Sequence, residues 1–274
     1  MSSVIKIGFS LIFLGLLAAG YVLFEPYWLR INNVTLIHQD IPLAFDGMQI
    51  IFASDIHHGP YFSQARVKRV VETINHLTPD LVIFGGDYVH RDPQYIEPCF
   101  EELQHIQAPF GKFGVLGNHD HWESAVITRQ QMQKAGITNL DNRSVWIVKE
   151  DARIKLGGVG DLWEDTQDLR PTLHDTTENN FVMLVSHNPD FAETLTMRQI
   201  DVMLSGHTHG GQITLFGRWA PLVPSRYGQK YRAGMVTTPF TTVLITHGVG
   251  TITPPVRFFA RPEIVVLTLR MKRR

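Results

Sequence analysis

Short apolar runs recur along the chain between polar stretches, and their lengths predict a mixture of buried strands and covering helices. Five runs rich in Val, Ile, Leu and Phe have the length and composition of strands that are buried on both faces. They are residues 50–53, 81–84, 113–116, 181–185 and 202–204. Residues 63–77 differ, because their apolar side chains recur every third or fourth position, which predicts an amphipathic helix.

The rest of the chain adds helices and late strands to this pattern. Two further covering helices are expected over residues 95–107 and 123–135, and a strand with a turn over residues 33–45. Later strands are expected at residues 212–215, 243–246 and 263–269. Strands that alternate with helices and end in several strands fit two sheets between helical layers. We therefore predict an α/β fold, a four-layer sandwich of two mixed β-sheets flanked by helices.

The N-terminal segment has a different pattern. Residues 7–24 are uncharged and mostly apolar, and at about 1.5 Å per residue they would span roughly 27 Å, close to the thickness of a bilayer's hydrocarbon core. Ala18-Ala19-Gly20 also fits a signal-peptide cleavage site, which is the alternative. Because the run is longer than the apolar part of most signal peptides, we expect an uncleaved, single-pass anchor. Lys6 and Arg30 place one positive charge on each side of this segment. The positive-inside rule therefore does not determine on which side of the membrane the domain lies.

Composition and charge narrow the class of partner. The 274 residues are 44% hydrophobic and 19% charged, as in a globular domain with a membrane segment. A formal charge of −1 argues against broad nucleic-acid binding, and no protein partner is inferred. Cys99 is the only cysteine, which excludes an intramolecular disulfide, and its place in a predicted helix indicates a packing role.

Polar side chains that bind metals follow each of the five apolar runs. The motifs are Asp55-Ile56-His57, Gly86-Asp87, Gly117-Asn118-His119-Asp120, Ser186-His187-Asn188 and Gly206-His207-Thr208-His209. Each motif alone has an ordinary explanation, such as a turn, a helix cap or a surface histidine pair. Ligands of open α/β sheets bind beyond the carboxyl ends of the strands. We therefore expect the five motifs to converge on one crevice.

The residue types in these motifs predict a site for two divalent cations. Asp55 and His57 are two residues apart, as are His207 and His209, and in an extended segment such side chains point the same way. Carboxylate oxygens and imidazoles suit Mn, Fe or Zn, whereas the lack of thiolates argues against an iron–sulfur or cysteine-rich zinc site. Two cations about 3.5–4 Å apart would activate water and bind the attacking and leaving oxygens of a phosphoryl displacement.

The order of the motifs resembles the calcineurin-like metallophosphoesterase superfamily, whose consensus runs D-x-H, G-D, G-N-H-[DE], H and G-H-x-H. The similarity covers about residues 48–270. Residues 85–89, 206–212 and 257–263 are similar to bacterial membrane-anchored phosphodiesterases, some of which hydrolyse the pyrophosphate of UDP-2,3-diacylglucosamine in lipid A synthesis. His90-Arg91-Asp92 replaces the D-R-G of phosphoprotein phosphatases, which argues against that class.

The resemblance implies a role for each residue of the motifs. It implies two metal sites that share a ligand, the first made by Asp55, His57 and His209, the second by Asn118, His187 and His207, and the bridge by Asp87. His119 would stay free of metal and either donate a proton to the leaving oxygen or bind the phosphoryl oxygens. Asp120 would orient the His119 imidazole, with a plain helix cap as the alternative.

Residues that contact the substrate are not identified by these motifs. Arg91 and Arg257 could bind a second phosphate, although surface arginines are commoner. Trp122, Trp163 and three tyrosines lie near the motifs or in loops, and packing is their default role. The sequence therefore leaves the substrate-binding residues unknown.

These observations divide the chain and predict its function. We expect an anchor over residues 1–25, a lead-in segment over 26–47, a metallophosphoesterase domain over 48–270 and a basic tail over 271–274. The predicted activity is hydrolysis of phosphodiester or pyrophosphate bonds, with a lipid-linked nucleotide as a candidate substrate, at the bacterial inner membrane by resemblance. One alternative is a phosphomonoesterase of the cell envelope or of proteins. Another is a catalytically dead, membrane-tethered binding scaffold.

Overall fold

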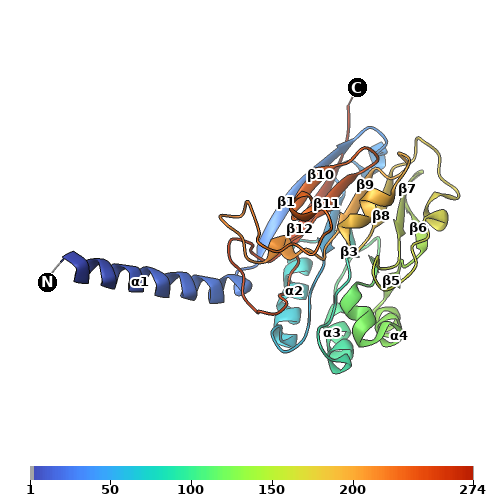
Figure 1. Ribbon diagram of the computed structural model, residues 1–274. Coiled ribbons are helices and arrows are strands. Elements are labelled where there is room, and N and C mark those ends of the chain that lie inside the picture. Colours follow the sequence, from blue (N-terminus) through green and yellow to red (C-terminus); the bar gives the residue numbers. More distant parts are fainter. Residues whose placement is uncertain (1–2, 274) are drawn as a thin grey trace.

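Two six-stranded sheets pack face to face in a computed structural model that describes residues 3–273 (Figure 1). The first sheet has the order β1-β12-β2-β3-β4-β5. Its strands are β1 (Arg30–His38), β12 (Glu263–Met271), β2 (Gln49–Ala53), β3 (Leu81–Phe84), β4 (Lys112–Gly114) and β5 (Ile137–Asn139). Only the pairing of β12 with β2 is antiparallel. This sheet is therefore mixed, as predicted.

The second sheet has the order β10-β11-β9-β8-β7-β6 and is also mixed. Its strands are β10 (Gly234–Thr237), β11 (Thr242–Ile245), β9 (Val202–Ser205), β8 (Val182–Val185), β7 (Ala152–Gly158) and β6 (Arg143–Lys149). The four central strands are parallel, and the two edge strands run antiparallel to their neighbours. The carboxyl ends of the central strands consequently lie along one edge.

Alternating side chains of the strands divide the core into layers. On β2, Ile50 and Phe52 face the second sheet, whereas Ile51 and Ala53 face the helices. The helical layer consists of α2 (Gln64–His76), α3 (Ile96–Leu103) and α4 (Asn118–Lys134). The outer face of the second sheet is covered by short segments, namely α5 (Arg170–Leu173), η4 (Pro189–Thr194) and η6 (Gly228–Tyr231). The predicted sandwich of two sheets with flanking helices is confirmed.

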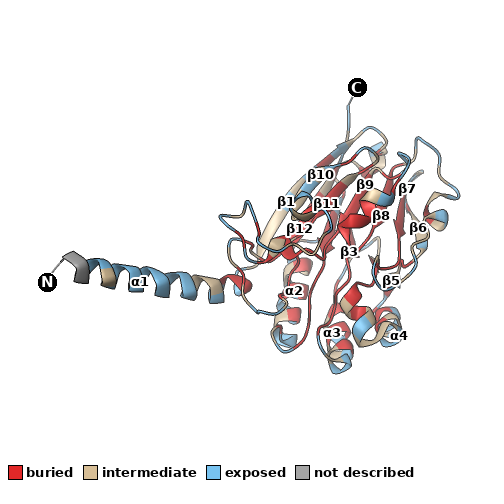
Figure 2. Ribbon diagram, viewed as in Figure 1, coloured by how far each residue is buried: buried red, intermediate tan, exposed pale blue. Residues whose placement is uncertain are grey.

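Helix α1 (Ser3–Phe24) extends alone from the domain, and its side chains from Lys6 onward are mostly exposed (Figure 2). The helix leads into η1 (Glu25–Tyr27) and then β1. Among the helices of the described residues, α1 has the length and the hydropathy needed to cross a membrane. An apolar surface of this size in water is unfavourable, so a signal sequence or a membrane anchor explains its composition.

Several element boundaries differ from the prediction. No strand forms at residues 212–215, where Ile213 and Leu215 make only isolated bridges to Phe258 and Trp219. Gln212 has a left-handed backbone (φ 52°), which interrupts an extended chain. The expected helix at 123–135 begins earlier, at Asn118, and is kinked at Ser124. The remaining predicted strands and helices lie within a few residues of their expected positions.

Candidate metal centre

The five motifs lie at the carboxyl ends of strands from both sheets. β2, β3 and β4 end just before the motifs that contain Asp55, Asp87 and Asn118, and β8 and β9 end just before those that contain His187 and His207. The predicted convergence follows from the parallel strands of each sheet, which bring their carboxyl ends to one edge.

Hydrogen bonds between the two sheets hold these strand ends together. His187 Nδ1 lies 2.7 Å from the carbonyl oxygen of Gly85, which follows β3. The backbone N–H of His207, which follows β9, donates to Asp55 Oδ1 at 3.0 Å. Within the first sheet, the N–H of Asp55 donates to the Gly86 carbonyl at 2.9 Å. The motifs are therefore fixed relative to one another by hydrogen bonds in each of which a backbone group takes part.

Five of the predicted ligands have a left-handed backbone. The φ angles are 54° at Asp55, 49° at His57, 55° at Asp87, 67° at His207 and 51° at His209. The extended geometry assumed from the sequence is therefore wrong at both D-x-H and H-x-H. These left-handed residues turn the chain sharply after β2, β3 and β9. Such conformations cost of order 1–3 kcal/mol each and concentrate at functional sites.

The first ligand cluster consists of Asp55, His57 and His209, all buried. The two imidazole Nε2 atoms lie 3.0 Å apart. Asp55 Oδ1 is 3.4 Å from Nε2 of His209 and 3.9 Å from Nε2 of His57. These three atoms face a common point, as the ligands of one ion must.

The second ligand cluster consists of Asp87, His187 and His207, also buried. Asp87 Oδ2 lies 3.2 Å from His187 Nε2, which in turn is 3.3 Å from His207 Nδ1. The same Asp87 oxygen lies 3.5 Å from Nε2 of His57 in the first cluster. One carboxylate oxygen thus stands between the two sets of imidazoles.

Asn118 occupies the first position of α4 beside this carboxylate. Its side chain is buried, and Oδ1 has no hydrogen-bond partner among the described residues. The next residue, His119, donates its backbone N–H to Asp87 Oδ1 at 2.9 Å. A buried amide oxygen without a partner is costly in a folded protein. A cation at the centre would satisfy it, so the donor set fits a divalent metal.

Burial favours neutral imidazoles on most of these ligands. It lowers the pKa of His207 to about 3 and holds the pKa values of His57 and His209 well below the ordinary value. Burial also disfavours charge on His187, but the Asp87 carboxylate beside it raises the pKa of that imidazole well above the ordinary value. Ligating imidazoles must be unprotonated, so a cation would replace the proton on His187.

Glycines allow the backbone to approach the carboxylates. A side chain at Gly117 would overlap the carboxylate of Asp87, and one at Gly206 would overlap Ser54 and the carboxylate of Asp55. Glycine is required here because only a residue without a Cβ fits this close approach.

His119 lies at the edge of the clusters and is only partly buried. Its ring centroid is 4.7 Å from that of His57 and 4.5 Å from that of Trp122. Its Nδ1 lies 3.1 Å from Nδ1 of His90, a residue that the motifs did not identify. Burial lowers the pKa of His90 to about 4, so His90 is a neutral partner. Its position three residues after Asp87 was the only sequence signal.

Asp120 does not orient the His119 imidazole, contrary to the prediction. Its two carboxylate oxygens accept backbone N–H groups of Asp87 at 2.8 Å, Tyr88 at 2.9 Å and Gly117 at 2.9 Å. The Gly117 bond caps the N-terminus of α4, as the alternative held. The other two bonds fix the turn that carries Asp87.

Arg257 is neither a phosphate ligand nor a surface residue. The side chain is fully buried, and its guanidinium donates to carbonyl oxygens of Gly250 and Ala260 at 2.6 Å each. It also donates to the His209 carbonyl at 3.2 Å. Burial lowers its pKa to about 10, which leaves the group charged at neutral pH. Arg257 therefore holds the loop behind the first cluster.

The tryptophans near the motifs flank the centre. Trp163 is about half exposed and lies edge-on to the ring of His207, with centroids 4.4 Å apart. Trp122 covers His119 and donates its indole N–H to Glu164 at 2.8 Å. Both aromatic side chains stand at the rim of the clusters with part of their surface free.

Comparisons with known proteins agree with this geometry. The family model described as Calcineurin-like phosphoesterase matches residues 48–211. Over 256 residues the chain is 34% identical to "Uncharacterized metallophosphoesterase YkuE" of Bacillus subtilis (strain 168), covering 92% of this chain and 89% of that protein. It is 30% identical over 260 residues to "Phosphodiesterase YaeI" of Escherichia coli (strain K12), covering 91% and 92% of the two chains.

More distant similarity extends to a eukaryotic protein and to a solved structure. The "Transmembrane protein with metallophosphoesterase domain" of Danio rerio is 26% identical over 254 residues, which cover 88% of this chain and 57% of that protein. The structure of Haemophilus influenzae NAD nucleotidase superposes with a TM-score of 0.50 at 12% identity, covering 74% and 50% of the chains. The latter similarity concerns the fold. The chain belongs to the calcineurin-like phosphoesterase family and is a hydrolase of phosphoric esters.

Proposed function

We propose that this hydrolase uses two divalent cations to cleave phosphodiester or pyrophosphate bonds. One cation would be held by Asp55, His57 and His209, and the other by Asn118, His187 and His207, with Asp87 between them. The position of Asp87 Oδ2, 3.5 Å from His57 and 3.2 Å from His187, carries this proposal. A single oxygen at such distances from both imidazole sets can serve two ions at once.

The donor types support Mn, Fe or Zn as the metal. All proposed ligands are carboxylate or amide oxygens and imidazole nitrogens, which suit these ions. The only thiol, that of Cys99, is buried beside the Tyr88 carbonyl, and burial raises its pKa well above the ordinary value. The cations, when bound, would supply positive charge at the phosphoryl group and a more acidic water molecule.

His119 is the proposed proton donor to the leaving oxygen. Its Nδ1 faces the neutral His90, which can accept that N–H, so the transferable proton is assigned to Nε2. Its backbone N–H is held by Asp87, which fixes the start of α4 relative to the cations. Protonation of a leaving alkoxide by such a residue contributes typically 10²–10⁴-fold to the rate.

Diester or pyrophosphate bonds are the proposed targets, with a lipid-linked nucleotide such as UDP-2,3-diacylglucosamine as the candidate substrate. YaeI, which is similar over nearly the whole chain, is named a phosphodiesterase. Helix α1, as an uncleaved anchor, would keep the centre near a membrane where lipid substrates are concentrated. His90-Arg91-Asp92 departs from the phosphoprotein phosphatase signature.

The experiment is a comparison of kcat/KM for an activated diester, its matching monoester and a nucleotide-diacyl sugar. The full-length protein is purified in detergent and supplied in turn with Mn, Fe and Zn. We expect the diester to be cleaved faster than the monoester and the lipid-linked nucleotide to be cleaved at its pyrophosphate. A preference for the monoester would favour the phosphomonoesterase, and metal binding without any hydrolysis would favour the dead scaffold.

A further inference from the structure

Exposed apolar side chains gather in the loop that follows the His207–His209 motif. In this segment, which we call the apolar loop (residues 213–222), Phe216 is 71% exposed and Leu222 is 77% exposed. Leu215 and Trp219 are each more than half exposed. A single exposed apolar residue is ordinary, but four within eight positions form a patch that water solvates poorly.

The apolar loop has a defined backbone, so these side chains are not exposed through disorder. The N–H of Leu215 donates to the Trp219 carbonyl at 2.7 Å, and the N–H of Arg218 donates back to the Leu215 carbonyl at 3.1 Å. The N–H of Gly217 donates to the hydroxyl of buried Thr214 at 2.9 Å. This tight turn presents the apolar side chains outward on a fixed frame.

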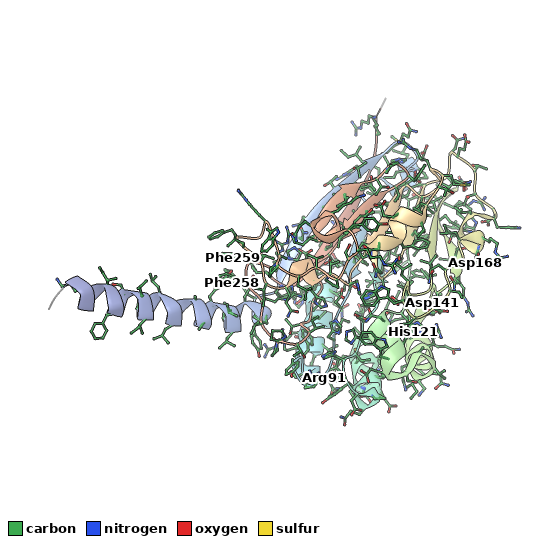
Figure 3. All side chains as sticks on the ribbon, viewed as in Figure 1. Arg91, His121, Asp141, Asp168, Phe258 and Phe259 are labelled. Carbon is green, nitrogen blue, oxygen red and sulfur yellow. The ribbon has the colours of Figure 1, made fainter. Side chains whose placement is uncertain are left out.

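A chain of aromatic contacts joins the apolar loop to the end of α1. Phe216 lies against Phe259, with ring centroids 5.4 Å apart, and Phe259 lies 4.5 Å from Phe258. Tyr21, near the C-terminal end of α1, contacts both, at 5.8 Å from Phe258 and 5.5 Å from Phe259. Figure 3 shows the two labelled phenylalanines beside the point where α1 leaves the domain.

The end of α1 is fixed to the same segment by polar contacts. The buried carboxylate of Glu25 accepts the backbone N–H groups of Phe259 and Ala260 at 2.7 Å each. Trp28, which follows this junction, is exposed, and the guanidinium of Arg261 lies over its ring at 3.9 Å from the centroid. Tryptophan and arginine are typical of membrane interfaces. The apolar loop therefore lies at the level where α1 would enter a bilayer.

We propose that the apolar loop inserts into the interfacial layer of the bilayer that α1 enters, as a second, shallow membrane contact. This inference rests on the proposed anchoring by α1, with which the patch is continuous. Arg218 is an exposed residue of the apolar loop. Lipid phosphates can bind its guanidinium while the neighbouring apolar side chains reach the acyl chains. The occupant is thus lipid rather than a protein surface.

The same contact sets the position of the metal centre relative to the membrane. Arg232 donates to the Gly210 carbonyl at 3.0 Å and to the Gly217 carbonyl at 2.7 Å. It thereby ties the apolar loop to the turn that carries His209. Because Arg232 joins the loop to this turn, insertion of the loop would hold the centre at a constant height above the headgroups.

Site-directed spin labelling of the full-length chain tests this insertion. Cys99 is fully buried and can stay in place. Nitroxides are attached at Phe216→Cys or Leu222→Cys, with Phe13→Cys in α1 as a marker of helix insertion. The matched controls are Leu43→Cys and Met197→Cys, which replace apolar residues that are 72% and 54% exposed elsewhere on the domain.

The proteins are reconstituted in vesicles of phosphatidylcholine and phosphatidylglycerol. Power saturation then measures how often each nitroxide collides with oxygen, which partitions into lipid, and with a nickel chelate, which stays in water. We expect oxygen to dominate at positions 13, 216 and 222 and the chelate to dominate at 43 and 197. Chelate access at 216 and 222 equal to the controls would overturn the proposal. Protection of the loop from both reagents would also overturn it, because it would indicate a protein partner.

Two further readouts keep the result interpretable. Hydrolysis of a water-soluble diester near the wild-type rate shows that each labelled protein is folded. If position 13 reports lipid while the loop reports water, the anchor stands and the loop contact is refuted. If position 13 also reports water, both membrane contacts are refuted, and the phosphoesterase chemistry is unaffected by either outcome.

Discussion

Aspartate and histidine are residues that tolerate a left-handed backbone better than most, and the proposed ligands use this property. Asp55, His57, Asp87, His207 and His209 all adopt positive φ angles. Such residues are enriched in this region of conformational space, although each still costs free energy. The same residue would therefore supply a ligand and permit the sharp turn that orients it.

Replacing His119 with alanine tests its proposed role as a proton donor. We expect the variant to keep its metal content and to lose roughly 10²–10⁴ in kcat, the usual scale for a general acid. The loss should shrink for a substrate whose leaving group needs no proton. His105→Ala, at an exposed position in the loop after α3, is the control and should behave as wild type. Loss of metal together with activity would instead identify His119 as a ligand.

Arg257→Met should destabilise the protein strongly, because it removes a buried guanidinium that donates several hydrogen bonds. The carbonyl oxygens of Gly250 and Ala260 would lose their hydrogen-bond donor, and an unsatisfied buried carbonyl costs about 1–3 kcal/mol. The His209 carbonyl would lose one of its two donors and keep the N–H of Gln212. The measurement is the thermal unfolding midpoint in detergent, compared with Arg143→Met at an exposed position. Similar midpoints for the two variants would refute the structural role of Arg257.

The residues of the centre are predictable from the sequence where they belong to a short motif. Their contacts are not predictable where the hydrogen-bond partner lies in a distant loop. Asp55 and His209 follow apolar runs that end at one edge, so their convergence follows from the sequence pattern alone. The partners of Asp120 are backbone amides more than thirty residues away for two of its three bonds. Similarly, nothing in the pattern around Arg257 indicates that loops from elsewhere enclose it.

Secondary structure is predictable wherever apolar runs are continuous. β2, β3, β8 and β9 are buried throughout or nearly so, and the composition of each indicates a strand. The pattern does not reveal β10, because its residues are partly exposed and flanked by loops. The segment at 212–215 resembles a strand because its polar and apolar residues alternate. In the structure its apolar side chains face outward from a loop instead of packing in a sheet.

The start of β9 provides a pH-dependent prediction. Asp201 accepts the N–H of Val182 at 2.7 Å, and its other oxygen lies 3.5 Å from His38 Nε2, with Asp40 on the opposite side of that imidazole. Burial raises the pKa of Asp201 to about 6. The folded state thus binds this proton more tightly than the unfolded state does. Its stabilising effect is complete below the unfolded pKa of about 4 and is lost as the pH rises to about 6.

Asp201→Asn keeps a hydrogen-bond acceptor for Val182 and removes the titration. We expect the variant to gain about 2–3 kcal/mol relative to wild type between about pH 4 and about pH 7. Urea unfolding of both proteins across this range measures the difference, in which effects on the metal centre cancel. Parallel stability profiles would contradict the assignment.

At the scale of the whole molecule, the packing of the two sheets determines where the five motifs lie. Parallel strands bring the motifs of both sheets to one edge, and the inter-sheet core made by residues such as Phe52 and Leu156 fixes their separation. The layer arrangement is predictable from alternating strands and helices. The order of strands is not, because the insertion of β12 between β1 and β2 depends on contacts over more than two hundred residues.

The central claim is that Asp87 joins two cations in one centre. The most direct test is the metal content of the full-length protein and of Asp87→Asn, measured by elemental analysis together with turnover of an activated diester. Asp168→Asn, a partner of Arg170 outside the clusters, is the matched control.

We predict two divalent ions per wild-type and Asp168→Asn chain. In Asp87→Asn we predict the loss of at least one ion and the collapse of turnover, because the amide cannot supply a charged oxygen to both sites. Two retained ions with near wild-type turnover in Asp87→Asn would contradict the dinuclear centre.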